Sequence, residues 1–422
     1  MNILVVGNGG REHALCYAIN KSPQKKKLYC APGNGGISKI AGCVAIDPLN
    51  FVEIKNFCIK EKVDLVIVGP EAPLVNGIVD YLDGIGIKTF GPSLQASKLE
   101  GSKSFMKSIC RKYNIPTAGY KEFDNYEDSL NFIKNNKMPL VIKVDGLAAG
   151  KGVTIALDQK TAIDAIENIF IKKNFGDGAK IIIEDFLDGE EASFFVACDG
   201  KDFLCLPTAQ DHKRVGEGET GPNTGGMGAY SPAPIITNDL SKKIIDTIIK
   251  PTLNGLLNEG IKYKGILYAG LMIVQNKPLL LEYNVRFGDP ECQPILYRLK
   301  TDIIDLFNAC INEKINKINL EWDQRLGLTV VLASNGYPGK YTSGSEINNL
   351  EMLDSNQNIE VFHSGTKIED GKTYAVGGRV LGITTIDNDI HLARKNVYEA
   401  INIIDWPEGF FRKDIGWRIM DK

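Results

Sequence analysis

The chain has 422 residues, of which 43% are hydrophobic and 24% are charged, and this composition is typical of a soluble globular protein. Its formal net charge of −3 argues against a nucleic-acid-binding surface. Nine cysteines without a CxxC pair and four widely spaced histidines argue against a disulfide framework and a Cys/His zinc site. No apolar run approaches the ~18 residues that span a bilayer, and no signal peptide precedes the first expected strand. We therefore expect a cytoplasmic protein of about two to four domains.

Residues 1–102 are expected to form a doubly wound parallel α/β domain. Short apolar runs such as NILVVG and VDLVIVG alternate with helical segments such as REHALCYAIN and LVNGIVDYLDGIG, with glycine or proline where the strands end. This βαβα pattern is typical of a parallel sheet, whose ligands bind beyond the carboxyl ends of the strands. The segments GNGGRE, APGNGG and GPEAP lie at those ends, so they are candidate ligand-binding turns.

The first of these turns, in VVGNGGREHAL, is close to a dinucleotide-binding fingerprint without completing it. Gly7 and Gly9 fit G-x-G-x-x-G, but Glu12 occupies the third glycine position and no acidic residue ends the next strand. This argues against a dehydrogenase. What remains is a glycine turn before a helix N-terminus, which favours a phosphate, with Arg11 as an additional cation. The alternative is a tight turn that binds nothing.

Residues 103–318 are expected to form the central domain, with a lid at about 115–190. A helix is expected from about Ser102, and apolar runs such as PLVIKV, GVTIAL and KIIIE predict strands after it. GILYAGLMIVQNKPLLLEYN predicts an antiparallel hairpin that turns at residues 275–277. Residues 319–422 are expected to form a third, strand-rich domain that ends with the helix ARKNVYEAINII.

The glycine-rich segment KVDGLAAGKGV joins two expected strands and is not a Walker loop. Three residues separate Gly146 from Gly150, and Gly152 follows Lys151 where a Walker loop has Ser or Thr. We interpret the segment as a flap that covers a triphosphate with its backbone N–H groups and Lys151. Lys143, the one charge in LVIKV, either extends to solvent or points into a nucleotide cleft, and we favour the cleft.

The segment IIIEDFLDGEEASFFV offers a second set of nucleotide contacts. Glu184 ends an apolar strand and Glu191 opens the next, so the linker between them has free backbone groups for an adenine edge. Phe186 or Leu187 would supply an apolar wall, and Glu191 is suited to accept two ribose hydroxyls. Taken singly, each acid is more often a surface residue.

Residues 210–234, QDHKRVGEGETGPNTGGMGAYSPAP, are expected to form a long functional loop. Polar residues that include Asp211, Lys213 and Arg214 precede six glycines, which permit close backbone approach to a ligand. Loops of this length inside a compact domain are uncommon unless they are functional. With its Asn and Thr side chains, the segment predicts an anion- and amine-binding loop, and a structural Ω-loop is the alternative.

The segment PLLLEYNVRFGDPE carries a buried strand directly into polar side chains. Residues two apart share a face of a strand, so Glu282, Asn284 and Arg286 are expected on one face and Leu281, Tyr283 and Val285 on the other. Oxygen ligands followed by a cation predict a metal and anion site at the strand end. The alternative is a strand that leaves the core at its solvated rim.

Together these segments resemble the phosphoribosylamine–glycine ligase family of the ATP-grasp superfamily. The resemblance covers essentially the whole chain in order, through GNGGREHAL, GPEAPLVNGIVD, LEGSK, DGLAAGKGV, EDFLDGEEASF, QDHKRVGEGETGPNTGGMGAYSPAP, YAGLM, RFGDPE and FRKDIGWR. It implies an N-terminal parallel-sheet domain, an ATP-grasp domain with a mobile lid and a small strand-rich C-terminal domain. It also implies a ligase of de novo purine biosynthesis that joins glycine to 5-phosphoribosylamine through a glycyl phosphate, with ATP as co-substrate.

The motifs and the resemblance together predict the residues of the site. The expected ATP-binding residues are Lys143, Gly146, Gly150, Lys151, Gly152, Glu184, Phe186, Leu187 and Glu191. The expected substrate-binding residues are Gly9, Gly10, Arg11, Glu71, Asp211, Lys213, Arg214, Asn223, Thr224, Gly225, Gly226, Met227, Arg286 and Asp289. The expected catalytic residues are Arg286, Asp289 and Lys151. Glu282 and Asn284 match the ligands of Mg²⁺ or Mn²⁺.

One position departs from the wider superfamily. Gly270 stands where many members carry a further acid on the preceding strand, which argues against a second metal held entirely by protein ligands. Two other functions remain as alternatives. Another ATP-grasp ligase or carboxylase would differ in the glycine-rich loop and in GPEAP, and a non-catalytic nucleotide sensor would lack Lys151, Glu282, Asn284 or Arg286. A monomer without nucleic-acid or membrane partners is expected.

Overall fold

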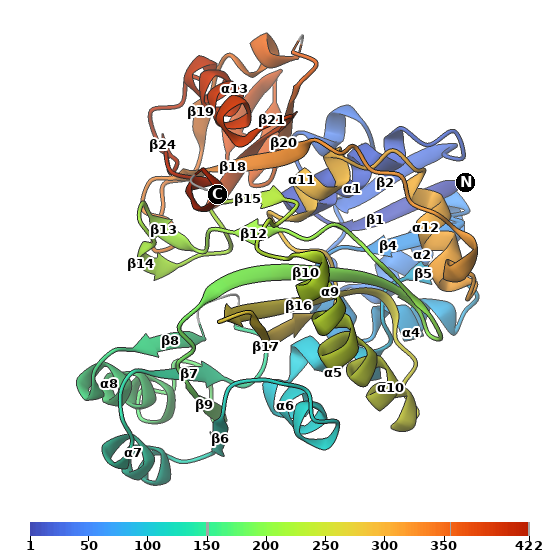
Figure 1. Cartoon of the computed structure of the whole chain (residues 1–422). Coiled ribbons are helices and arrows are strands. Elements are labelled where there is room, and N and C mark those ends of the chain that lie inside the picture. Colours follow the sequence, from blue (N-terminus) through green and yellow to red (C-terminus); the bar gives the residue numbers. More distant parts are fainter. Residues whose placement is uncertain (149–151, 355, 421–422) are drawn as a thin grey trace.

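The computed structural model describes residues 1–148, 152–354 and 356–420 (Figure 1). Its N-terminal part is the parallel α/β unit that the sequence predicts, with strands in the order β3-β2-β1-β4-β5. The strands are β1 (Asn2–Gly7), β2 (Lys27–Pro32), β3 (Gly42–Cys43), β4 (Leu65–Val68) and β5 (Thr89–Phe90). The helices are α1 (Gly10–Asn20), α2 (Phe51–Glu61), α3 (Glu71–Val75) and α4 (Ile78–Asp83), with the short η1 (Ile37–Lys39).

Strand β1 is covered on both faces, as parallel sheets usually are. Ile3 and Val5 pack into one hydrophobic core, while Leu4 and Val6 pack into another. Successive strand side chains point to opposite faces, so one short strand can serve both cores. The segment LVNGIVDYLDGIG, expected as one helix, is divided between α3 and α4, because Gly77 takes a left-handed φ of 83° between them.

The expected helix at Ser102 is a pair, α5 (Leu94–Gly101) and α6 (Lys103–Lys112), and the Ser102 hydroxyl accepts from the backbone N–H of Phe105 to cap the second. Beyond it lies a separate antiparallel sheet in the order β6-β9-β7-β8, at the lower left of Figure 1. We call this unit the lid. Its elements are β6 (Tyr120–Phe123), α7 (Tyr126–Asn135), β7 (Leu140–Val144), β8 (Val153–Ala156), α8 (Gln159–Phe170) and β9 (Ile181–Asp185).

A second antiparallel sheet, which we call the floor, has the order β11-β10-β16-β17. Its strands are β10 (Glu190–Asp199), β11 (Phe203–Cys205), β16 (Lys264–Val274) and β17 (Lys277–Asn284). One core beside it includes side chains of α9 (Asn238–Ile244), η2 (Ile245–Ile249) and α10 (Lys250–Asn258), and the other includes side chains of α12 (Ile303–Ile311).

The hairpin of the floor turns at Gln275 and Asn276, both with positive φ, so Lys277 already belongs to β17 rather than to the turn. Near the end of β17, Gly270 pairs with Glu282 while Leu271 pairs with Leu280. Leu281 is therefore an extra residue in a β-bulge. Bulges bend a strand and re-aim the side chains beside them.

The C-terminal part contains a sheet in the order β12-β15-β18-β23-β20, with β24 paired to β18, and a three-stranded sheet β19-β22-β21. Two elements precede β18 in the chain, α11 (Cys292–Tyr297) and η3 (Ile315–Lys317). The C-terminal elements are β18 (Leu326–Ser334), β19 (Ser345–Ile347), η4 (Leu350–Leu353), β20 (Ile359–His363), β21 (Thr366–Glu369), β22 (Lys372–Ala375), β23 (Arg379–Asp387), α13 (Ile390–Ile403), β24 (Gly409–Phe410) and η5 (Trp417–Ile419).

The glycine-rich segment is not the single long loop that the sequence predicts. It contains β12 (Gln210–Asp211), the hairpin β13 (Arg214–Gly216) and β14 (Thr220–Asn223), and β15 (Gly228–Ser231). Glycine has a low strand propensity, so the sequence did not indicate these strands. β15 pairs with β18, far away in the chain, and β12 pairs with β15. Across the residues that the structure describes, no helix is long and apolar enough to cross a membrane.

Candidate active site

A cavity of about 500 Å³ opens where the N-terminal turns, the lid, the floor and the C-terminal sheet meet. Many of the predicted site residues line this cavity, although they are far apart in the chain. Those that line it are Gly9, Arg11, Glu71, Gly146, Gly152, Asp211, Lys213, Thr224, Gly225, Glu282, Asn284, Arg286 and Asp289. The same walls include residues that the sequence analysis did not select, among them Glu100, Lys103, Tyr268, Glu291, Tyr337 and Arg379.

The other predicted residues lie behind or beside the lining. Gly10 is packed against Gln293, and the Met227 side chain is fully buried in the C-terminal core, so only the Met227 backbone could meet a ligand. Arg214 and Asn223 pair across the β13–β14 hairpin. Gly226 is packed against the Pro290 ring. The remaining predictions fall on Lys143, Glu184, Phe186, Leu187 and Glu191, described below, and on Gly150 and Lys151, which lie outside the described residues.

A buried charge network joins the lid to α6. Glu184 lies near the end of β9, and its two oxygens are 2.9 Å from Nζ of Lys107 and 2.8 Å from Nζ of Lys143. All three side chains are almost wholly buried. Lys143 therefore does not extend to solvent, and its Nζ also donates to the backbone oxygen of Leu281 on the floor, at 3.2 Å. Two lysines around one carboxylate leave a net positive charge buried at the junction of lid and floor.

The linker between β9 and β10 carries Phe186 and Leu187. Phe186 is 36% exposed, so its ring is available to a ligand, and Leu187 is half-buried. Glu191 follows on β10, where its carboxylate is 2.7 Å from Nζ of Lys213. Two residues predicted for different ligands, the nucleotide and the acceptor, are thus ion-paired with each other.

Arg286 sits between two acids from different elements. Its Nη2 is 2.8 Å from Glu100 at the end of α5, and its Nε is 3.3 Å from Glu71 at the start of α3. Burial lowers the pKa of the Arg286 guanidinium, but these acids raise it more, so it stays above its ordinary value. Burial raises the pKa of Glu71, yet Arg286 and Arg11 hold it below its ordinary value. Arg286 is therefore a fixed cation in the cavity wall, and its Nη1 also donates to the backbone oxygen of Phe287 at 3.2 Å.

Glu282 and Asn284 line the cavity from β17, while the Tyr283 side chain between them is buried in a hydrophobic core. Within the described part of the chain, no residue donates a hydrogen bond to the carboxylate oxygens of Glu282 or to the amide oxygen of Asn284. Burial raises the pKa of Glu282, but neighbouring lysines, Lys213 first, lower it below its ordinary value. An ionised carboxylate beside an amide oxygen fits a hard divalent cation that takes its other ligands from water and phosphate.

The described residues contain no group of three or more His, Cys, Asp or Glu side chains arranged to hold a metal ion. Gly270 pairs directly with Glu282 in the floor, so the position at which many superfamily members carry a further acid has no side chain here. A metal ion beside Glu282 would therefore take no ligand from residue 270.

Sequence reasoning missed Glu100, Lys103 and Lys107, of which Glu100 and Lys103 lie in the LEGSK motif. Lys103 Nζ donates to the Gly146 oxygen at 2.9 Å, which ties α6 to the β7–β8 loop. The LEGSK motif was the available signal for Glu100 and Lys103, and the sequence carried none for Lys107, because charged residues in a helix are otherwise typical of a solvated surface.

Family models agree with this architecture along the chain. The models described as phosphoribosylglycinamide synthetase N domain, ATP-grasp (A) domain and C domain match residues 1–100, 101–292 and 327–418. Phosphoribosylamine–glycine ligase of Brucella melitensis biotype 1 is 48% identical over 422 residues, covering 100% of this chain and 99% of that protein. The enzyme of Escherichia coli O157:H7 is 47% identical over 427 residues, with the same coverage.

Solved structures show the same fold. The crystal structure of phosphoribosylamine–glycine ligase from Thermotoga maritima has a TM-score of 0.84 and 31% identity, covering 99% of this chain and 100% of that one. A biotin carboxylase from Campylobacter jejuni, at 15% identity and TM-score 0.72 over 100% of this chain and 95% of that one, shares the fold alone. The chain belongs to the phosphoribosylamine–glycine ligase family of ATP-grasp enzymes.

Proposed function

We propose that this protein joins glycine to 5-phosphoribosylamine with consumption of ATP, and releases glycinamide ribonucleotide, ADP and phosphate. The observation that carries the proposal is the meeting, in one cavity, of the β7–β8 loop, the Glu282–Asn284 pair and Arg286 with the turns of the N-terminal sheet. Such convergence suits a reaction in which the protein mainly positions reactants and offsets charge.

ATP would lie between lid and floor. Lys143 and the network around Glu184 face the adenosine end, with Phe186, Leu187 and Glu191 beside it, and Gly146, Gly152 and Lys103 adjoin the phosphates. Gly150 and Lys151 are proposed for the same flap. Glu282 and Asn284 would hold Mg²⁺, which we favour over Mn²⁺ and which would offset the phosphate charge when bound.

The reaction then has two displacements. A carboxylate oxygen of glycine, held by Arg286, attacks the γ-phosphorus, and the bond to the leaving ADP oxygen breaks. The amine of phosphoribosylamine next attacks the acyl carbon, loses a proton and expels phosphate. Glu71 and Asp289 would orient that amine and its ribose, and the glycine turn with Gly9, Gly10 and Arg11 would bind the phosphate. The segment from Asp211 to Met227 would close over the acceptor.

We also propose the domain division 1–102, 103–318 with the lid at about 115–190, and 319–422. Its support is the separation of the parallel sheet, the lid and floor, and the strand-rich C-terminal part, although β12 and β15 pair with the C-terminal sheet. A monomeric state and a cytoplasmic location remain predictions, and size-exclusion chromatography would test the first.

The direct test supplies ATP, Mg²⁺, glycine and freshly made phosphoribosylamine, and measures ADP release with each omitted in turn. We expect release to require all four, because a glycyl phosphate is reactive and is best formed when its acceptor is bound. Full-rate release with bicarbonate in place of glycine would instead identify a carboxylase of the same fold.

Glu71→Ala tests the acceptor side of the cavity. We expect KM for phosphoribosylamine to rise about tenfold, since a charge-assisted hydrogen bond is lost, while KM for ATP stays nearly constant. KM for glycine should change less, because Arg286 keeps its 2.8 Å pair with Glu100. Steady-state kinetics with each substrate varied would measure this, and a larger effect on ATP than on phosphoribosylamine would remove Glu71 from the acceptor pocket.

A further inference from the structure

Arg379, at the start of β23, is one of the residues that the C-terminal sheet contributes to the cavity wall. It opens β23 after a pair of glycines, and the pairing of β23 with β18 is irregular beside it, because Leu332 pairs with Leu381 and Ala333 pairs with Arg379. Such a bulge re-aims a neighbouring side chain. Here the Arg379 side chain is part of the cavity lining.

The guanidinium of Arg379 joins two chain segments that both line the cavity. Nη1 donates to the backbone oxygens of Gly225, at 2.5 Å, and Asp289, at 2.6 Å. Nη2 lies 3.1 Å from Oδ2 of Asp289, and the two side chains are only 19% and 13% exposed. Gly225 lies between β14 and β15, whereas Asp289 follows β17, so one side chain ties together the glycine-rich segment, the floor and the C-terminal sheet.

Asp289 is also held from its other side. Nε2 of Gln293 donates to Oδ1 at 2.9 Å, and a Cβ on Gly9 would lie 3.1 Å from Oδ2, so the carboxylate is fixed against the start of α1. Burial raises the pKa of Asp289, but Arg379 and then Arg11 lower it more, so it stays below its ordinary value. The carboxylate is thus both oriented and ionised.

We propose that Arg379 is a positioning residue of the active site, which holds the Asp289 carboxylate and the Gly225 backbone in the geometry that binds the amine substrate. This inference rests on the proposed function, because it takes Asp289 as the residue that faces phosphoribosylamine. It makes the C-terminal sheet a working part of the site. The acceptor pocket is incomplete without it.

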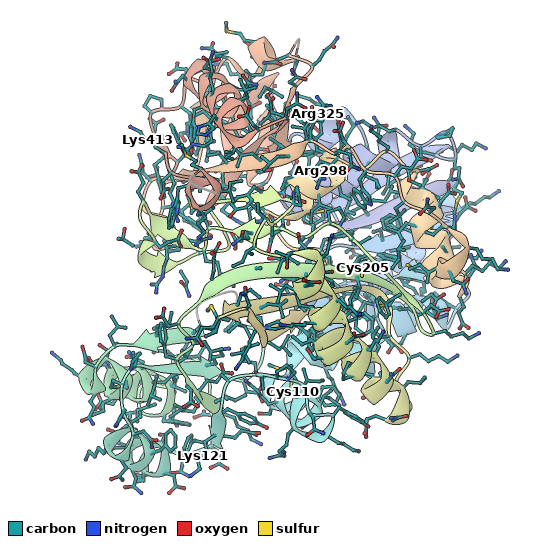
Figure 2. The ribbon with its side chains drawn as sticks, in the orientation of Figure 1. Cys110, Lys121, Cys205, Arg298, Arg325 and Lys413 are labelled. Carbon is teal, nitrogen blue, oxygen red and sulfur yellow. The ribbon has the colours of Figure 1, made fainter. Side chains whose placement is uncertain are left out.

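Arg379→Gln is expected to lower kcat/KM for phosphoribosylamine by roughly 30-fold through a higher KM, because a charge-assisted hydrogen-bonded pair is lost. KM for ATP should stay within about threefold, since the nucleotide contacts lie on other elements. The matched control is Arg325→Gln. Arg325, labelled in Figure 2, does not line the cavity and is paired with Asp323 at 2.8 Å, so the control also removes an arginine–aspartate pair. The control should keep all kinetic constants.

A double-mutant cycle with Asp289→Asn separates positioning from general destabilisation. If Arg379 acts through Asp289, the fold loss in kcat/KM for phosphoribosylamine caused by Arg379→Gln should be at least about ten times smaller in the Asp289→Asn protein than in the wild type. Effects that multiply independently, or equal losses in the Arg325 control, would overturn the proposal. Should the Gln variant fail to fold, the cycle is run with Arg379→Lys, which keeps the charge but lacks the planar fork. A wild type that releases no ADP with glycine and phosphoribosylamine would reject the proposed function, whereas an active wild type with unaffected Arg379 variants rejects this inference alone.

Discussion

Arg286→Lys is expected to lower kcat/KM for glycine by about 100-fold, although it preserves the charge. Glycine offers little to recognise except its carboxylate, and that carboxylate is also the reacting group. A guanidinium presents two parallel N–H donors matched to two carboxylate oxygens, whereas a lysine is a point charge. The expected loss is about 2.7 kcal/mol of transition-state stabilisation. ATP binding measured without turnover should change little.

Arg286 also has contacts that are consistent with a purely structural role. Arg286 pairs with Glu100 and Glu71, so it could serve only to join α5, α3 and the end of β17. In that case the Lys variant would lose thermal stability and keep its glycine kinetics. Arg298→Lys, labelled in Figure 2, is the matched control, because Arg298 is buried and donates to Asp323 and Ser231 away from the cavity. Arg298→Lys should lower the thermal stability and leave the kinetic constants for glycine unchanged.

Glu282→Gln is expected to lower kcat by roughly 100-fold or more, because removing a direct metal ligand should exceed the effects seen for outer-shell residues. The shape is kept, so the unfolding midpoint should move little. The Mg²⁺ concentration for half-maximal activity should rise, and a titration of ADP release against Mg²⁺ would measure it. Unchanged turnover at saturating Mg²⁺ would exclude Glu282 as a ligand.

The control for that experiment is Glu313→Gln. Glu313 is paired with Lys201, Lys262 and Lys264 on the surface, and it does not line the cavity. It also loses a carboxylate among lysines, but surface pairs contribute little to stability. Both its kcat and its metal titration should match those of the wild type.

Local patterns in the sequence were sufficient for much of the fold. The βαβα rhythm before residue 102 predicted the parallel sheet, and the alternation along β17 correctly placed Tyr283 and Val285 in the core. It was wrong for Leu281, which was expected beside them, because Leu281 is the extra residue of the bulge and Leu280 is buried in its place. Both predictions rest on the spacing of apolar residues, which repeats every two residues in a strand and about every 3.6 residues in a helix, so a short segment is enough to show it. The glycine turns were also placed correctly at the strand ends, since turn chemistry is local.

Tertiary structure alone decided which distant side chains complete the cavity. Glu100 meets Arg286 and Arg379 meets Asp289 only after the sheets have packed, and no periodic pattern encodes such pairs. The glycine-rich segment was predicted as one loop because glycine disfavours strands, yet β15 forms by pairing with β18. Ion pairs and strand pairing between remote segments depend on the packed chain as a whole, so the sequence by itself indicated many of the residues that line the cavity, and the fold determined the others and how they meet.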